Sequence, residues 1–296
     1  MNKWMNLFLW IRANVFVHLP YGLVLKVGKV LGWLLYHGLK SRRQVAESNI
    51  KKALQLGSDE ARKLARSCFT HLGLTTAEIL LIPRVTKKFV HRHVEIEGIE
   101  HLEQALAEGK GVVVFTGHFG NWELMGAVVA SLGYPVDAVA RKQNSSGADE
   151  FMAEVRRQYG LRIHERGFSL RAAFRALKQG RMLALLADQD ARGRGWFVDF
   201  FNQPSSTFSG PVQLAQRLGA PIVPAFFVRT GRPGYRLVFC PPRQVAPDAS
   251  IEEMQNQLQE LTTTLEDTIR QYPEQWFWIH RRWKTKPLSA EESRET

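Results

Sequence analysis

Two polar clusters in this sequence have residue types suited to catalysis. The first, Thr116-Gly-His-Phe-Gly-Asn-Trp-Glu123, directly follows Val112–Phe115, a β-branched and aromatic run typical of a buried strand. A histidine and a carboxylate at this spacing can form a base and its orienter. Glu123, in the first turn of the next helix, would turn back toward the imidazole and fix its tautomer, while His118 takes a proton from a nucleophile. The alternative is a histidine with only local hydrogen bonds beside a helix N-terminus.

The nucleophile for such a base is expected to come from the substrate. The sequence contains neither a GxSxG motif nor a Cys–His pattern, and HExxH-type zinc motifs are absent as well. Its two cysteines, Cys68 and Cys240, are too few for a disulfide framework or a Cys-rich zinc site. A substrate hydroxyl deprotonated by His118 would then attack an acyl carbonyl directly, without a covalent enzyme intermediate.

The second cluster is Asp188-Gln-Asp190, which follows the predicted strand Leu183–Ala187. Two carboxylates at this spacing can hold a divalent metal ion, as in transferases that use sugar nucleotides. They can equally pair with nearby cations such as Arg192 and Arg194, or position a substrate. The sequence alone leaves these interpretations open.

A third cluster, Pro273-Glu-Gln-Trp-Phe-Trp-Ile-His-Arg-Arg-Trp-Lys284, interleaves aromatic and basic residues after a helix that must end before Pro273. This composition can bind single-stranded nucleic acid. It also suits a phosphorylated head group at a membrane interface. A packed aromatic segment with a solvated basic end is the third interpretation.

The elements that position these clusters alternate between strands and helices of ten or so residues. This order predicts an α/β fold with a mixed sheet flanked by helices, in which ligands bind at the carboxyl ends of strands. The Gly-Arg-Pro-Gly turn at 231–234 predicts one antiparallel pairing, and 87–99 reads as a polar connector with short extended pieces. We expect strands at 112–116, 136–140, 183–187, 222–228 and 236–240, and helices at 43–56, 59–82, 100–108, 122–132, 149–159, 170–179, 211–218 and 251–271.

Length and charge set the class of protein and of partner. The chain has 296 residues, of which 45% are apolar, enough for a large core and far from a disordered composition. Its formal net charge of +12 favours an anionic partner such as a phosphorylated lipid, a nucleic acid or an acidic protein.

The N-terminal segment indicates contact with a membrane surface. Residues 1–45 contain no acidic residue, whereas Trp4, Leu7, Phe8 and Ile11, and again Val27, Val30, Leu31, Leu34 and Leu35, follow helical spacing. A spanning helix needs about 20 mainly apolar residues, and Arg12, Pro20, Lys26 and Lys29 interrupt every such run. We therefore expect helices that lie on the membrane. The alternative is that they pack on their own domain.

Taken together, these clusters resemble the bacterial lipid A biosynthesis acyltransferases, the late lauroyl and myristoyl transferases. The chain has His118-x4-Glu123, which is similar to the HX4(D/E) signature of glycerolipid acyltransferases. The match covers roughly residues 5–287. Its other blocks are Asp188-Gln-Asp190 with Trp196-Phe-Val-Asp-Phe-Phe, Pro204-Ser-Ser-Thr207 before a helix, and Pro273-Glu-Gln-Trp with His280-Arg-Arg-Trp-Lys.

The resemblance implies a glycerolipid-acyltransferase-like fold, with a membrane-associating segment at 1–45 and an acyltransferase domain at 46–296. It implies that His118 is the general base, Glu123 its orienter, Arg156 a group that steadies the thioester oxyanion or a phosphate, and Asp188 a further catalytic acid. We expect eight other residues to bind substrates: Asn121, Arg157, Arg166, Asp190, Thr207, His280, Arg281 and Arg282.

The implied reaction moves an acyl chain from acyl carrier protein to a hydroxyl of a lipid A precursor or related glycolipid. It takes place at the cytoplasmic face of the inner membrane and needs no metal or cofactor. The expected partners are therefore the carrier protein, the anionic glycolipid and the membrane surface, and nucleic acid is not among them. The alternatives are a metal-dependent glycosyltransferase that uses Asp188 and Asp190, an acyltransferase for another membrane lipid, and a non-enzymatic basic binding protein.

Overall fold

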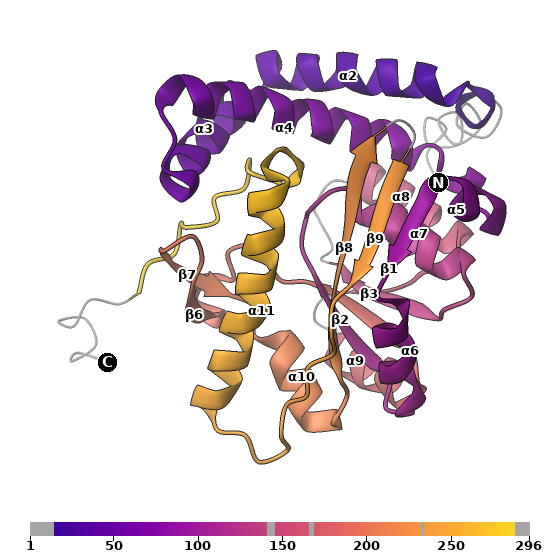
Figure 1. The fold of residues 1–296 in the computed structure, drawn as a ribbon, viewed down its shortest axis with the longest axis vertical. Coiled ribbons are helices and arrows are strands. Elements are labelled where there is room, and N and C mark those ends of the chain that lie inside the picture. Colours follow the sequence, from indigo (N-terminus) through magenta and orange to yellow (C-terminus); the bar gives the residue numbers. More distant parts are fainter. Residues whose placement is uncertain (1–14, 141–145, 166–168, 232–233, 288–296) are drawn as a thin grey trace.

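The centre of the protein is a seven-stranded sheet in the order β1-β9-β8-β2-β5-β3-β4 (Figure 1). The computed structural model describes residues 15–140, 146–165, 169–231 and 234–287. The sheet strands are β1 (Val94–Glu97), β2 (Val112–Thr116), β3 (Val136–Ala140), β4 (Arg162–Glu165), β5 (Met182–Leu186), β8 (Ile222–Gly231) and β9 (Gly234–Phe239). A separate antiparallel hairpin pairs β6 (Trp196–Asp199) with β7 (Pro204–Thr207).

The sheet is mixed, as predicted. Neighbouring strands are parallel except for β8 and β9, which pair antiparallel with Arg229 opposite Tyr235. That pair is the one the turn at 231–234 predicted. The expected α/β class, with helices flanking a mixed sheet, is therefore confirmed.

Helices and sheet enclose two apolar cores. Because side chains alternate along a strand, Val113 and Phe115 of β2 join one core, and Val112 and Val114 join the other. The first core includes side chains from α9 (Ser169–Lys178), α10 (Gly210–Leu218) and α11 (Ile251–Gln271). The second includes side chains from α5 (Lys87–His93), α6 (Ile99–Ala107), α7 (Trp122–Ser131) and α8 (Ser146–Gln158).

Three N-terminal helices cover one end of the domain: α2 (Tyr21–Gly38), α3 (Lys40–Leu54) and α4 (Ser58–Ile79) (Figure 1). As predicted, Pro20 interrupts the helical pattern, and α2 starts directly after it. Glycines let α2 and α4 approach closely, since a Cβ at Gly73 would overlap backbone atoms of Gly28 and Gly32. The expected domain boundary after residue 45 falls inside α3.

One face of α2 packs on the domain and the opposite face is exposed. Gly28, Gly32 and Tyr36 are buried toward α4. The outer face exposes Leu23, Val27, Val30, Trp33 and Leu34. Within the described ranges, no helix is long and apolar enough to cross a membrane. The first predicted stripe, Trp4 to Ile11, lies outside the described residues.

Several elements differ from the sequence prediction. The connector at 87–99 contains α5, which Thr86 caps by accepting the amide of Phe89 (3.3 Å), and then β1. Neither β4 nor the β6–β7 hairpin was predicted, because these four-residue strands carry too little apolar periodicity to detect. Helix α3 also begins three residues earlier than predicted.

Candidate active site

The first two polar clusters meet at the carboxyl ends of adjacent strands. β2 and β5 are parallel neighbours, and Thr116 at the end of β2 lies opposite Leu186 at the end of β5. The amide of Ala187 also donates to the carbonyl of Thr116 (3.1 Å), which extends the ladder by one residue. The loops that follow the two strands therefore leave the sheet side by side, and this places His118 against Asp188.

His118 and Asp188 make two hydrogen bonds with each other. The imidazole Nδ1 lies 2.7 Å from Oδ1 of Asp188, and the backbone amide of His118 donates to Oδ2 over 2.8 Å. The indole Nε1 of Trp276 also donates to Oδ2 (2.9 Å). Gly117 permits this approach, because a Cβ there would lie 3.1 Å from the Asp188 carboxyl carbon. The carboxylate is thus fixed by three N–H groups and in turn fixes the imidazole.

These contacts determine the roles of the two imidazole nitrogens. Burial acts to raise the pKa of the Asp188 carboxyl, but the charge interaction and hydrogen bonds with His118, together with the Trp276 bond, hold that pKa below its ordinary value. An ionised carboxylate only accepts hydrogen bonds, so Nδ1 carries the proton and Nε2 is left as the basic nitrogen. The side-chain amide nitrogen of Gln189 lies 3.4 Å from Nε2. The side chain of Asp188 is 2% exposed and that of His118 is 22% exposed, so the base can be reached and its partner cannot.

The prediction that Glu123 orients His118 was wrong, because Asp188 occupies that position. Glu123 is the second residue of α7 and its carboxylate is nearly buried. It forms a bidentate ion pair with Arg156 of α8, in which Nε donates to Oε2 over 2.9 Å and Nη2 contacts Oε1. Glu123 and Arg156 were both predicted as catalytic. In the structure they form an ion pair with each other, and Glu123 does not orient His118.

A narrow crevice, lined mainly by aromatic and apolar groups, opens beside His118. Its lining includes Leu72, Trp122, Trp276, Phe277 and Trp278. The rings of Trp122 and Phe277 lie 5.1 and 5.8 Å from the imidazole, centroid to centroid. His71 also lines the crevice, and burial and the charge of Arg229 lower its pKa to about 4. His71 is therefore neutral at neutral pH, and Glu274 is the carboxylate in the lining.

The third cluster is largely a packed aromatic core. Trp276, Trp278 and Trp283 are buried against Phe200 and Phe201. The prediction that Arg282 and Thr207 bind substrate is corrected by their burial. The Arg282 guanidinium donates to the carbonyl of Ser206 (2.6 Å) and to the Thr207 hydroxyl, which ties the C-terminal segment to β7. Arg281 is exposed.

The other predicted substrate-binding residues fall into different surroundings. Asn121 is buried and caps α7 by accepting the amide of Leu124 (3.0 Å), so its predicted contact with substrate is replaced by a structural one. Arg157 binds Glu154 on its own helix, and its side chain is 77% exposed. Arg166 lies outside the described residues.

Asp190 and His280 stay close to the site. Asp190 Oδ2 accepts the hydroxyl of Thr285 (3.0 Å), while its Oδ1 is buried without a hydrogen-bond partner. Burial lowers the pKa of His280, and Asp188 and Asp190 are among the charges that act on it. In the part of the chain that the structure describes, no group of three His, Cys, Asp or Glu side chains is arranged to hold a metal ion.

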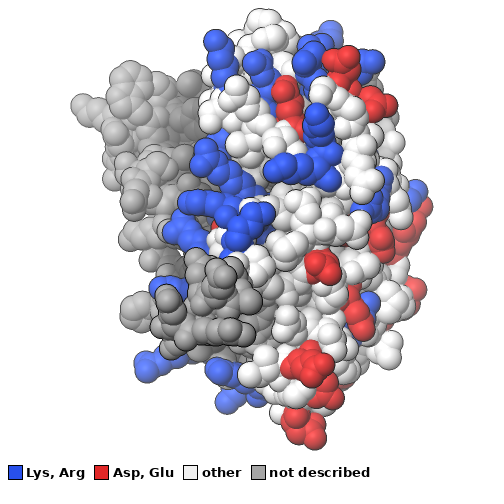
Figure 2. All heavy atoms as spheres, turned by 90° about the vertical axis from the view of Figure 1, so that its left-hand side faces the viewer, with Lys and Arg blue, Asp and Glu red and all other residues white. Residues whose placement is uncertain are grey.

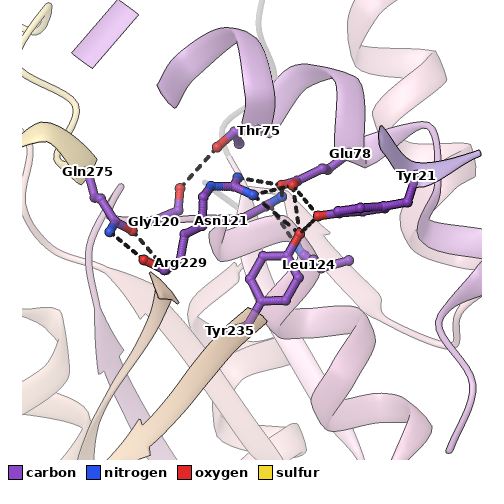
Figure 3. A network of polar contacts seen from close by, with 9 residues as sticks. All are labelled: Tyr21, Thr75, Glu78, Gly120, Asn121, Leu124, Arg229, Tyr235 and Gln275. Carbon is purple, nitrogen blue, oxygen red and sulfur yellow. Dashed lines mark hydrogen bonds and ion pairs between the residues drawn. The ribbon is translucent and has the colours of Figure 1, made fainter. Parts of the chain in front are cut away.

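Sequence reasoning missed the residues that support the loop after β2. Glu78 of α4 and Arg229 of β8 form a buried ion pair, and Tyr21 and Tyr235 contact the same carboxylate (Figure 3). A signal was present, since Glu78 is the one charged residue within 72–83 and Arg229 directly follows the apolar run 221–228. A lone charge in such a run indicates a buried partner.

A basic imidazole nitrogen, held by a buried carboxylate beside an apolar crevice on an α/β sheet, is an arrangement that can accept a proton in general-base catalysis. The sequence profile described as bacterial lipid A biosynthesis acyltransferase matches residues 1–285. The chain therefore belongs to the family of bacterial lipid A biosynthesis acyltransferases and is an acyltransferase.

Individual relatives agree with this assignment. The lipid A biosynthesis palmitoleoyltransferase of Escherichia coli is 29% identical, over 95% of this chain and 90% of the relative. The lauroyltransferase of the same organism is 27% identical, over 94% and 92%. A phosphatidylinositol mannoside acyltransferase of Mycobacterium tuberculosis is 26% identical, over 70% and 66%. Among solved structures, the 1-acyl-sn-glycerophosphate acyltransferase PlsC of Thermotoga maritima aligns with 84% of this chain and 97% of its own, at a TM-score of 0.40 and 14% identity.

Proposed function

We propose that this protein transfers a fatty acyl chain from acyl carrier protein to a hydroxyl of a lipid A precursor or a closely related glycolipid. The observation that carries the proposal is the His118–Asp188 pair, which leaves Nε2 as a base at the edge of an apolar crevice. Family membership supports the reaction class, and the names of the relatives support lipid A or a mannosylated glycolipid as the acceptor.

The proposed reaction has two proton transfers through His118. Nε2 takes the proton of the acceptor hydroxyl as its oxygen attacks the thioester carbonyl carbon. Asp188 stabilises the imidazolium that forms, because its ionised carboxylate already accepts the Nδ1 proton. When the carbon–sulfur bond breaks, the sulfur of the carrier protein leaves as a thiolate and takes the proton from Nε2. The products are an ester on the glycolipid and a free thiol.

Glu123 and Arg156 have a second role in this proposal. Glu123 lies at the start of α7, five residues after His118. It holds the guanidinium of Arg156 in a fixed plane. A fixed positive charge near the reacting centre can stabilise the thioester oxyanion or bind a phosphate of the acceptor. Glu123 would then act through Arg156, and not through the imidazole.

The exposed face of α2 supports attachment to a membrane surface. Leu23, Val27, Val30, Trp33 and Leu34 form an apolar stripe on this helix, with Lys26 and Lys29 exposed beside it. An apolar stripe flanked by cations is typical of a helix that lies in the interface of an anionic bilayer. The substrate lipid would reach the crevice from that surface, at the cytoplasmic face of the inner membrane.

A second surface carries positive charge suited to an anionic partner. Figure 2 shows Lys and Arg gathered over the upper and middle parts of one face of the molecule. Helix α3 and the C-terminal segment meet on this side, where Asn49 donates to the carbonyls of Trp278 and His280. Their exposed cations are suited to the acidic carrier protein or to lipid phosphates. They are Lys40, Arg42, Lys51, Lys52, Arg281, Lys284 and Lys286.

An unbiased transfer assay tests the proposal. Purified protein is incubated with carrier proteins that bear acyl chains of mixed length and with a bacterial lipid extract that contains lipid A precursor, and mass shifts are read. We expect the precursor to gain one acyl mass in the wild type and not in His118→Ala. A shift on another glycolipid, such as a mannosylated phosphatidylinositol, keeps the chemistry and changes the acceptor.

Two further results would contradict the proposal. Retained turnover in a folded His118→Ala protein would rule out the imidazole as the base. Transfer of a sugar from a sugar nucleotide, lost with chelator and restored by manganese, would assign the site to glycosyl transfer at Asp188 and Asp190. We expect acyl transfer to continue in the presence of chelator, because Asp188 already accepts hydrogen bonds from His118 and Trp276.

A further inference from the structure

Four polar side chains from different elements converge on the buried carboxylate of Glu78 (Figure 3). Arg229 donates through both terminal nitrogens, with Nη2 2.6 Å from Oε2 and Nη1 on Oε1. The hydroxyls of Tyr235 and Tyr21 donate to Oε1 over 2.6 and 2.7 Å. Asn121 donates from Nδ2 to Oε2 over 2.8 Å. Every element that contributes to this Glu78 network is therefore attached to one point on α4.

Stability alone is a poor reason for such a network. Burial acts to raise the pKa of Glu78, but the hydrogen bonds and charge of Arg229, with the bonds from Tyr235 and Tyr21, hold that pKa below its ordinary value. The carboxylate is therefore charged in the interior. Buried ion pairs are often no more stabilising than well-packed apolar side chains of the same volume, because both charges lose their hydration. The network does, however, give fixed positions to the four side chains that it joins.

The geometry that this network fixes is the turn between His118 and α7. Asn121 is the N-cap of α7, and it accepts the amide of Leu124 with Oδ1 while its Nδ2 is on Glu78. Its two ends thus connect the start of the helix to the buried carboxylate. Because Glu123 lies in the first turn of the same helix, the position of α7 also sets the position of the Arg156 pair.

Gly120 is held from the Arg229 side. Its amide donates to the carbonyl of Gln275 (2.8 Å), and its carbonyl accepts the hydroxyl of Thr75 (3.2 Å). The side-chain amide of Gln275 in turn makes two 2.9 Å bonds with the backbone of Arg229. Gly120 has a φ of +58°, and a Cβ there would overlap the carbonyl oxygen of Phe227. The turn after His118 is thus held on one side by Asn121, which binds Glu78, and on the other by Gln275, which binds the backbone of Arg229.

We propose that Glu78 is a positioning residue for acyl transfer, and that it fixes the loop bearing His118 and the start of α7 through Asn121 and Arg229. The inference rests on the proposed role of His118 as the general base. In this positioning role, Glu78 does not touch the substrate. Its effect is on the placement of the base and of Glu123, and it should therefore appear in turnover and not in substrate affinity.

The fold supplies a matched control at the other end of the sheet. Asp137 and Arg181 form a second buried ion pair, in which Arg181 Nε donates to Asp137 Oδ1 over 2.6 Å. Asp137 lies near the start of β3 and Arg181 directly precedes β5, whereas His118 and Asp188 follow the carboxyl ends of their strands. Asp137→Asn removes a buried charge of the same kind, at a place remote from the catalytic loop.

The experiment measures kcat, KM and thermal unfolding for Glu78→Gln, Asn121→Ser, their double variant and Asp137→Asn. Serine can still cap α7, but it is too short to reach Glu78. We expect kcat to fall about 10- to 100-fold in each single variant of the network with KM unchanged, as a misplaced catalytic group typically costs. The double variant should lose little more than either single variant. Asp137→Asn should lose thermal stability and keep its kcat.

The inference is overturned if Glu78→Gln keeps the kcat of Asp137→Asn at a temperature where both are folded, since the network is then only structural. It also fails if the two losses in kcat multiply in the double variant, because Glu78 then does not act through Asn121. Should Glu78→Gln not fold, Asn121→Ser and Tyr235→Phe are compared with Asp137→Asn in the same way.

A readout without turnover separates this inference from the proposed function. The ¹⁵N resonances of the His118 imidazole report the Nδ1 hydrogen bond to Asp188. We expect them to shift in Glu78→Gln and to stay in place in Asp137→Asn, whether or not acyl transfer is the reaction. Unchanged resonances in Glu78→Gln would contradict the positioning role. Retained acyl transfer in His118→Ala would instead contradict the general-base role of His118, and the resonances would still test whether Glu78 positions the His118 loop.

Discussion

The backbone amide and the ring Nδ1 of His118 both donate to the carboxylate of Asp188, which lies 70 residues further along the chain. Asp188 thus fixes both the loop and the side chain of His118. Two parallel neighbours, β2 and β5, make this possible because their carboxyl ends lie at the same edge of the sheet. Asp188 is therefore the orienting carboxylate, and Glu123 belongs to a different pair.

Replacing Asp188 by asparagine should slow turnover strongly. The amide is nearly isosteric, but it carries no charge to stabilise the imidazolium and can hold the wrong tautomer of His118. We expect kcat to fall by about 10²–10⁴-fold, the usual contribution of general-base catalysis, with KM little changed. Steady-state kinetics with acyl carrier protein and lipid acceptor measure this. Asp199→Asn, an exposed carboxylate on β6, is the control and should keep full activity.

The Glu123–Arg156 pair should behave as one unit in kinetics. Its bidentate geometry needs the planar guanidinium, so Arg156→Lys keeps the charge and loses the fixed orientation. We expect Arg156→Lys and Glu123→Gln each to lower kcat by about 10- to 10³-fold, in the range of lost oxyanion stabilisation.

A double variant tests whether the two residues act together. If Glu123 works through Arg156, the combined variant should be no slower than the slower single one. Multiplying losses would show that Glu123 has an independent role, such as a direct contact with His118 during the reaction. Arg157→Lys, on the exposed side of α8, serves as a neighbouring control because its partner is Glu154.

Local patterns made most of the fold predictable. Apolar periodicity located the strands β2, β3, β5, β8 and β9 and the helices between them, and the turn at 231–234 indicated the one antiparallel pair. Short elements escaped because a four-residue strand such as β4 or β6 carries almost no periodic signal. Local sequence also placed His118 in a glycine-containing loop directly after a strand, which the structure confirms.

The partner of His118 could not be obtained from local spacing. Strand order decides which loop lies beside the base, and nothing near residue 118 encodes that β5 is the neighbour of β2. Glu123 is close in sequence, but the first turn of α7 carries it to Arg156 of α8. Arg282 was misassigned for a related reason, because a basic residue beside tryptophans reads as surface, while its partners are on β7.

Binding to membranes should depend on the exposed face of α2. Trp33 is 59% exposed on this face, and Trp33→Glu places a charge where the proposed contact buries an apolar ring. We expect this substitution to weaken binding to anionic vesicles by about tenfold or more, measured by co-sedimentation with phosphatidylglycerol-containing liposomes.

A second exposed apolar residue separates membrane contact from general hydrophobicity. Ile251 is 67% exposed at the start of α11 and is not on α2. Ile251→Glu should leave vesicle binding unchanged. Equal losses for the two variants, or none for Trp33→Glu, would contradict the assignment of the α2 face to the membrane.

The stability contributed by Glu78 should depend on pH in a definite direction. Its pKa in the folded protein is held below the ordinary value by Arg229 and the two tyrosines, despite the opposing effect of burial. The charged network therefore contributes fully above the pKa of an unfolded glutamate, about 4.3, and is lost as the pH falls below that value through the folded pKa.

Urea unfolding at pH 7 should show Glu78→Gln to be less stable than the wild type by about 3–5 kcal/mol, the range for breaking one side of a buried ion pair. The difference should shrink at pH values below the folded pKa, where the wild type is protonated as well. A difference that grows as the pH falls from 7 toward 4.3 would contradict this, because it would show that Glu78 is protonated in the native protein.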